Sequence, residues 1–98
     1  MADQIVLPVA RAEYLAEYAR QWASGSAAAL RFEHEFVQAV TDIRAWPELW
    51  PLVQDDDNYR FRRFKKLPYL LVYRLGGGIA VIVALRHHRQ DTGSWKGR

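Results

Sequence analysis

The sequence predicts an α+β fold in which a helical hairpin packs on a small antiparallel sheet, with the element order β-α-α-β-β-β. Helical periodicity dominates residues 11–46, and residues 58–88 contain three β-like runs separated by turn signals. The chain has 98 residues, of which half are hydrophobic, and this fits a single domain with its own core. We therefore treat residues 1–98 as one domain.

The first element is a short β-like run at residues 4–10, QIVLPVA. Pro8 has no N–H group to donate to a neighbouring strand, which places such a segment at a sheet edge. Residues 1–10 are therefore expected to form an edge strand.

Two helices are expected across residues 11–46. Apolar residues recur every four positions, at Tyr14, Tyr18 and Trp22 in the first helix and at Phe32, Phe36 and Val40 in the second. Ser24-Gly25-Ser26 separates the two helices, and Pro47 ends the second one. The short connection predicts an αα-hairpin.

The remaining strands are expected within residues 58–88. The β-like runs lie at residues 59–64, 69–75 and 79–87. The glycine triplet at residues 76–78 supplies a hairpin turn, and short connections favour a three-stranded antiparallel meander. Residues 52–58 are interpreted as an acidic loop before the meander, and residues 89–98 as a C-terminal tail.

Charge is distributed unevenly along the chain. Residues 1–57 contain four Arg and ten Asp or Glu, whereas residues 58–98 contain ten Lys or Arg and one Asp. A strongly basic half suggests an acidic or polyanionic partner. The alternative is that the acidic helical layer simply neutralises the basic sheet.

The strand sequence YRFRRF carries much of this positive charge. Strand alternation divides it into two faces, with Tyr59, Phe61 and Arg63 on one and Arg60, Arg62 and Phe64 on the other. We expect the helices to cover the face that carries Phe61. Arg60 and Arg62 would then project from an open, anion-binding face, with Lys65 and Lys66 at the following turn. A charged, solvated strand that resists edge aggregation is the alternative.

A second polar cluster, Arg86-His87-His88-Arg89, follows the third run. Histidine can transfer protons near neutral pH, and arginine can stabilise a phosphate. Trp95 could stack on a base or cover apolar surface. Ordinary surface residues are the alternative. No metal site is predicted, because adjacent strand residues point apart and the chain has no cysteine.

Several function classes are excluded. The HE pair at His34-Glu35 has Gln38 where a zinc-protease motif needs its second histidine, and the glycine triplet lacks a P-loop lysine. The longest apolar run, at residues 79–85, is too short to cross a bilayer, and the first residues lack the pattern of a signal peptide. A soluble, cytoplasmic protein that needs no membrane is expected.

Three motifs follow the helical hairpin in a recognisable order: RFRRFKKLPYLLVYR at residues 60–74, IAVIVALRHHR at 79–89 and WKGR at 95–98. This order resembles the RelE/ParE superfamily of toxins from bacterial type II toxin–antitoxin systems, whose members are sometimes described as plasmid stabilisation proteins. The resemblance covers essentially the whole chain and is clearest over residues 29–98. It implies a growth-inhibiting toxin that is neutralised by a cognate antitoxin and meets operator DNA only through that antitoxin.

The superfamily has two branches with different activities. The resemblance implies either a ribosome-dependent mRNA endonuclease that promotes 2′-OH attack without a metal, as in RelE, or a DNA gyrase inhibitor, as in ParE. Arg60 and Arg62 occupy the places of the strand lysines of RelE, but arginine is a poor general base. Leu70 replaces a basic residue, and Trp95 replaces a tyrosine and has no phenolic proton. These departures favour the ParE branch.

We therefore predict a toxin that inhibits growth by binding an essential target such as DNA gyrase, without a cofactor and without catalysis. An mRNA interferase acting on the ribosome is the alternative, and an inactive family member is a weaker third. The residues expected to contact the target or antitoxin are Arg60, Arg62, Arg63, Lys65, Lys66, Arg74, Arg86, Arg89 and Trp95. The catalytic candidates for a nuclease are His87, His88, Arg89 and Arg62, where Arg89 or His88 matches a basic residue near the C-terminus of RelE.

Overall fold

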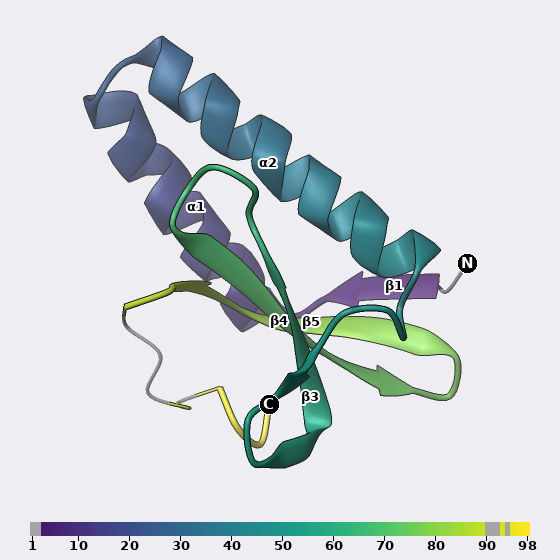
Figure 1. Cartoon of the computed structure of the whole chain (residues 1–98). Coiled ribbons are helices and arrows are strands. Elements are labelled where there is room, and N and C mark those ends of the chain that lie inside the picture. Colours follow the sequence, from purple (N-terminus) through teal and green to yellow (C-terminus); the bar gives the residue numbers. More distant parts are fainter. Residues whose placement is uncertain (1–2, 90–92, 94) are drawn as a thin grey trace.

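In the computed structural model, which describes residues 3–89, 93 and 95–98, two helices lie on one face of a five-stranded sheet (Figure 1). The elements are β1 (Asp3–Val6), α1 (Pro8–Ala23), α2 (Ser26–Ala45), β2 (Leu52–Val53), β3 (Asp56–Arg63), β4 (Tyr69–Gly76) and β5 (Ile79–His87). The predicted α+β class and the helical hairpin are confirmed. The first helix begins earlier than expected, at Pro8, because the fixed φ of proline suits the first helical position.

The strand order in the sheet is β1-β5-β4-β3-β2. The last three strands form the predicted antiparallel meander, and β1 lies at the sheet edge, where it pairs in parallel with β5. Residues 52–58 were expected to be a loop, but only residues 54–55 form a turn, while Leu52–Val53 form β2 and residues 56–58 begin β3. Asp55 has a φ of 62° beside this hairpin turn, a conformation that aspartate tolerates better than most residues.

A bulge interrupts the pairing of the two central strands. Val72 pairs with Ala84, but the next residue, Tyr73, pairs with Ile82. Val83 is therefore the extra residue, and Val83 and Ala84 both face away from the helices.

The sheet carries an apolar core on each face. The first core lies under the helices, where Phe32 and Ile43 pack with Leu71, Tyr73 and Ile82. The second core lies on the opposite face and contains Tyr59, Val72, Val81, Val83 and Trp95. Trp95 thus covers part of the face that was expected to be open.

The expectation that the helices cover the face of Phe61 is wrong. Phe61 packs with the second core, while Phe64 belongs to the core beneath the helices. Arg62 points to the same side as Phe64 and is only 5% exposed. The face of β3 that carries Arg62 meets the helices because α2 supplies a carboxylate for Arg62. The other face packs away from the helices because Trp95 supplies an apolar cover for Tyr59.

Candidate functional site

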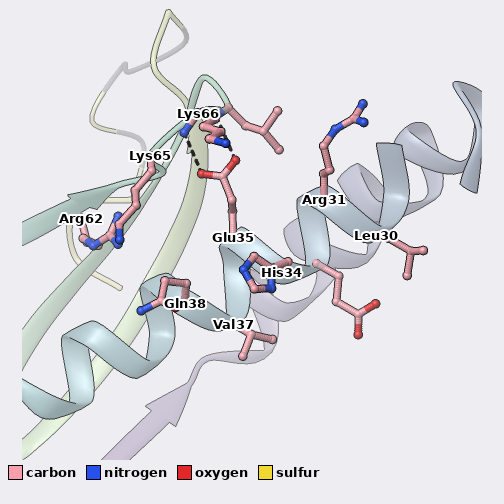
Figure 2. A pocket seen from close by; sticks show the side chains of 11 residues that line it. Leu30, Arg31, His34, Glu35, Val37, Gln38, Arg62, Lys65 and Lys66 are labelled. Carbon is pink, nitrogen blue, oxygen red and sulfur yellow. Dashed lines mark hydrogen bonds between the residues drawn. The ribbon is translucent and has the colours of Figure 1, made fainter. Parts of the chain in front are cut away.

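A groove of about 930 Å³ lies between α2 and the turn that joins β3 to β4 (Figure 2). Leu30 and Val37 of α2 contribute apolar surface and are 61% and 54% exposed. They lie two helical turns apart and therefore on the same side of the helix. Arg31 and the turn residues Lys65 and Lys66 add positive charge to the groove.

Glu35 fixes the shape of this groove. Its carboxylate accepts hydrogen bonds from the backbone N–H of Lys66 at 2.8 Å and of Leu67 at 3.1 Å, as Figure 2 shows. The turn is thereby attached to α2, and the Glu35 charge is already engaged. Among the described residues, no carboxylate forms an ion pair with Arg31, Lys65 or Lys66. The groove lining therefore combines cations with exposed apolar side chains.

Arg62 lines the groove and also stabilises the fold. Its Nη2 donates to Asp42 Oδ2 at 2.6 Å, its guanidinium stacks 4.9 Å from the centre of the Trp50 ring, and Nη1 donates to the Arg63 carbonyl. Burial alone would raise the pKa of Asp42. Hydrogen bonds from Arg62 and Gln38, together with nearby positive charge, outweigh that effect and hold the pKa below its usual value.

Three further arginines predicted to bind partners also serve the fold. Arg60 Nη1 donates to the carbonyls of Glu48 at 3.1 Å and Trp50 at 2.7 Å. Arg74 Nε donates to the Arg98 carbonyl at 3.1 Å. Arg86 Nη1 donates to Glu13 Oε2 at 2.9 Å.

The other predicted contact residues divide into two groups. Trp95 is 1% exposed and packs edge-on against Tyr59, with 4.9 Å between the ring centres, so it covers apolar surface here. Arg63, Lys65, Lys66 and Arg89 are exposed. These four cations are the part of the predicted binding set that is displayed to solvent.

A second groove, of about 360 Å³, lies on the opposite face of the sheet beside the tail. Its lining includes Phe61, Arg63, Leu70, His88, Trp95 and Lys96. Leu70, His88 and Trp95, which were compared with nuclease positions, therefore do meet at one place. Arg62 lies on the helix side and does not join them.

The two histidines stack on each other, with ring centres 4.9 Å apart, although adjacent strand residues were expected to point apart. Alternation fails because β5 ends at His87. His88 Nδ1 lies 3.1 Å from the Pro68 carbonyl, which can only accept, so this nitrogen carries the proton. His87 packs edge-on to Tyr69 at 5.4 Å.

Tyr69 donates from its hydroxyl to Glu17 Oε2 at 2.8 Å and accepts a hydrogen bond from Gln21 at 3.1 Å. Burial, followed by the contact with Glu17, raises the pKa of Tyr69. This hydroxyl therefore stays protonated near neutral pH and links α1 to β4.

Within the described part of the chain, no group of three or more His, Cys, Asp or Glu side chains could hold a metal ion. Of the helices described, neither is long and apolar enough to cross a membrane.

Three acidic residues organise these surfaces, and the sequence reasoning missed them. Glu13 binds Arg86, Asp42 binds Arg62, and Glu35 binds the β3–β4 turn. Each lies beside an apolar stripe of a helix. This position was the one feature of the sequence that could have identified these residues as structural. Their partners are 20 or more positions away, so local periodicity could not identify the pairs.

Comparisons with known proteins agree with this architecture. No curated protein sequence matches the chain. A solved structure, described as the chromosomal ParDE toxin–antitoxin system from P. aeruginosa, is similar with a TM-score of 0.76 and 17% identity, over 89% of this chain and 96% of that one. The model of the family described as "ParE toxin of type II toxin-antitoxin system, parDE" matches residues 7–92. This chain therefore belongs to the ParE toxin family of type II toxin–antitoxin systems.

Proposed function

We propose that this chain arrests bacterial growth by binding an essential cytoplasmic protein such as DNA gyrase, without catalysing a reaction, and that a cognate antitoxin neutralises it. Membership of the ParE toxin family supports the toxin role. The observation that carries the antitoxin part is the groove beside α2, whose lining includes exposed Leu30 and Val37 together with Arg31, Lys65 and Lys66.

This groove suits an amphipathic segment with acidic residues along one side. The apolar side chains of such a segment would cover Leu30 and Val37, and its carboxylates would face Lys65 and Lys66. The positive charge would also attract an acidic chain before contact and speed association. The groove is therefore proposed as the place where the antitoxin binds.

Three measurements test the proposal. Expression of this chain alone should arrest growth, and the purified protein should inhibit DNA supercoiling by gyrase. Co-expression of the protein encoded next to this chain's gene should restore growth. Lys65→Glu/Lys66→Glu should stay toxic but escape that rescue, whereas Arg89→Glu, another exposed cation, should still be rescued. Normal growth at verified soluble expression would contradict the toxin role.

An mRNA interferase is the second candidate, and the second groove favours it. Arg63, His88 and Lys96 meet there beside Phe61 and Trp95, and no described residue that lines this groove is acidic. Ribosome-phased mRNA cleavage after induction is expected only from the nuclease. A His87→Ala/His88→Ala variant that stays fully toxic would exclude a histidine-dependent mechanism.

A further inference from the structure

The connector after α2, residues 46–51 with sequence WPELWP, holds two large apolar side chains in solvent. Trp46 is 64% exposed and Leu49 is 67% exposed. The backbone N–H of Leu49 donates to the Trp46 carbonyl at 3.1 Å, which closes a tight turn and keeps the two residues close together. Neither side chain lines the two grooves described above. We call residues 46–49 the Trp–Leu turn.

This turn is held rigidly, although its side chains contribute little to the core. The Pro47 carbonyl accepts from the Tyr73 hydroxyl at 2.5 Å, and the Glu48 carbonyl accepts from Arg60 Nη1 at 3.1 Å. Tyr73 is itself fully buried in the sheet, so the turn is attached to the core. Pro47 further reduces the freedom of the connector.

We propose that the Trp–Leu turn is an anchor that inserts into an apolar pocket on the folded target protein of this toxin. The inference rests on the proposed function. A tryptophan in a rigid, exposed setting is typical of the residues that dominate binding energy at interfaces, because little conformational freedom is lost on insertion.

Shape and charge favour a folded target over the antitoxin as the partner. An amphipathic segment that folds on binding needs a groove to enter, whereas exposed side chains at the tip of a turn need a pocket on the partner. The Trp–Leu turn also carries the exposed acid Glu48, whereas the groove beside α2 displays lysines. The helical rise from His34, which lines that groove, to Trp46 is about 18 Å, so the groove and the Trp–Leu turn are separate surfaces along α2.

The test uses the full chain with Trp46→Ala/Leu49→Ala. Its matched control is Trp22→Ala/Leu15→Ala, which removes the same two side-chain types from exposed positions on α1. Both proteins are compared with the wild type for growth arrest at equal soluble expression, for inhibition of purified gyrase, and for thermal unfolding. The turn variant should unfold like the wild type, inhibit gyrase at least tenfold more weakly and arrest growth less, whereas the control should act like the wild type.

The outcomes separate this inference from the proposed function. If the wild type arrests growth and the turn variant does so equally, the anchor is wrong and the toxin role stands. If the wild type leaves growth unaffected, the toxin role and the anchor both fail. If the wild type arrests growth without inhibiting gyrase, the growth comparison alone decides whether the turn is the anchor. Sedimentation adds a check: a change in oligomeric state with unchanged toxicity would assign the turn to self-association and overturn the inference.

Discussion

The carboxylate of Glu13 accepts hydrogen bonds from the guanidinium of Arg98 at 3.1 and 3.2 Å, although 85 positions separate the two residues. The same carboxylate accepts from Arg86 at 2.9 Å and from the backbone N–H of Leu85 at 3.2 Å. Arg98 also donates to the Val83 carbonyl at 3.0 Å. The Glu13 side chain of α1 is thus hydrogen-bonded both to β5 and to Arg98, which follows Trp95 of the second core.

The first prediction concerns this arrangement. Glu13→Gln should lower the free energy of unfolding by about 1–3 kcal/mol, because the largely buried Arg86 and Arg98 lose a charged partner. Trypsin should also cleave after Lys96 faster than in the wild type. Urea unfolding and timed proteolysis measure the two effects. Glu48→Gln, at an exposed position, should change neither; equal effects of both variants would contradict the role of Glu13.

Arg62 and Arg63 give a second comparison between adjacent residues. Arg62→Met should cost about 3 kcal/mol of stability, because Asp42 loses its closest cation and Trp50 loses its stacking partner. Arg63→Met, at an exposed position, should cost less than about 0.5 kcal/mol. Chemical denaturation measures both. Adding Asp42→Asn to Arg62→Met should cost little more, and full additivity would show that the pair does not interact.

The pH dependence of stability should report on Asp42. Its pKa in the folded state lies below the ordinary value for an aspartate, so the unfolded state binds the proton more readily. The contribution of Asp42 is therefore complete above about pH 4 and is lost as the pH falls through the folded-state pKa. Between pH 2 and 6, the free energy of unfolding measured by chemical denaturation should fall less steeply with decreasing pH in Asp42→Asn than in the wild type. Identical slopes would contradict the assignment.

Trp95 should be required for folding rather than for contact with a partner. Trp95→Ala removes a fully buried ring and should lower the free energy of unfolding by about 3–5 kcal/mol. Its thermal unfolding should therefore occur at a lower temperature than that of the wild type. Trp95→Phe keeps an aromatic ring against Tyr59 and should retain most of the stability and full growth arrest. A stable Trp95→Phe protein that has lost toxicity would instead give the indole a direct role in target binding.

Periodicity was sufficient to predict the helices, the meander and the two-face division of β3. It could not decide which face of β3 meets the helices, because both faces carry aromatic side chains. The choice depends on Asp42 in α2 and on Trp95, which lie 20 positions before Arg62 and 36 after Tyr59 in the chain. The two-residue strand β2 was missed because its pairing with β3 starts at an acidic turn that has no glycine.

The candidate site was predicted less well than the fold. The lysines at residues 65 and 66 follow from the sequence, but the groove beside them requires the bond from Glu35 to the turn. The density of arginine suggested one binding surface. In the structure Arg60, Arg62, Arg74 and Arg86 are bound to groups of the same chain. A count of charges cannot distinguish cations used within the fold from cations offered to a partner.

The parallel pairing of β1 with β5 has a consequence for the order of synthesis. Asp3 pairs with Ile79, so the ribosome must release nearly the whole domain before β1 finds its neighbour. A product terminated before β5 would lack a central strand of the sheet and the side chains that β5 supplies to both cores. Interrupted translation would then yield fragments for proteolysis, and the binding surfaces would form only on chains completed through β5.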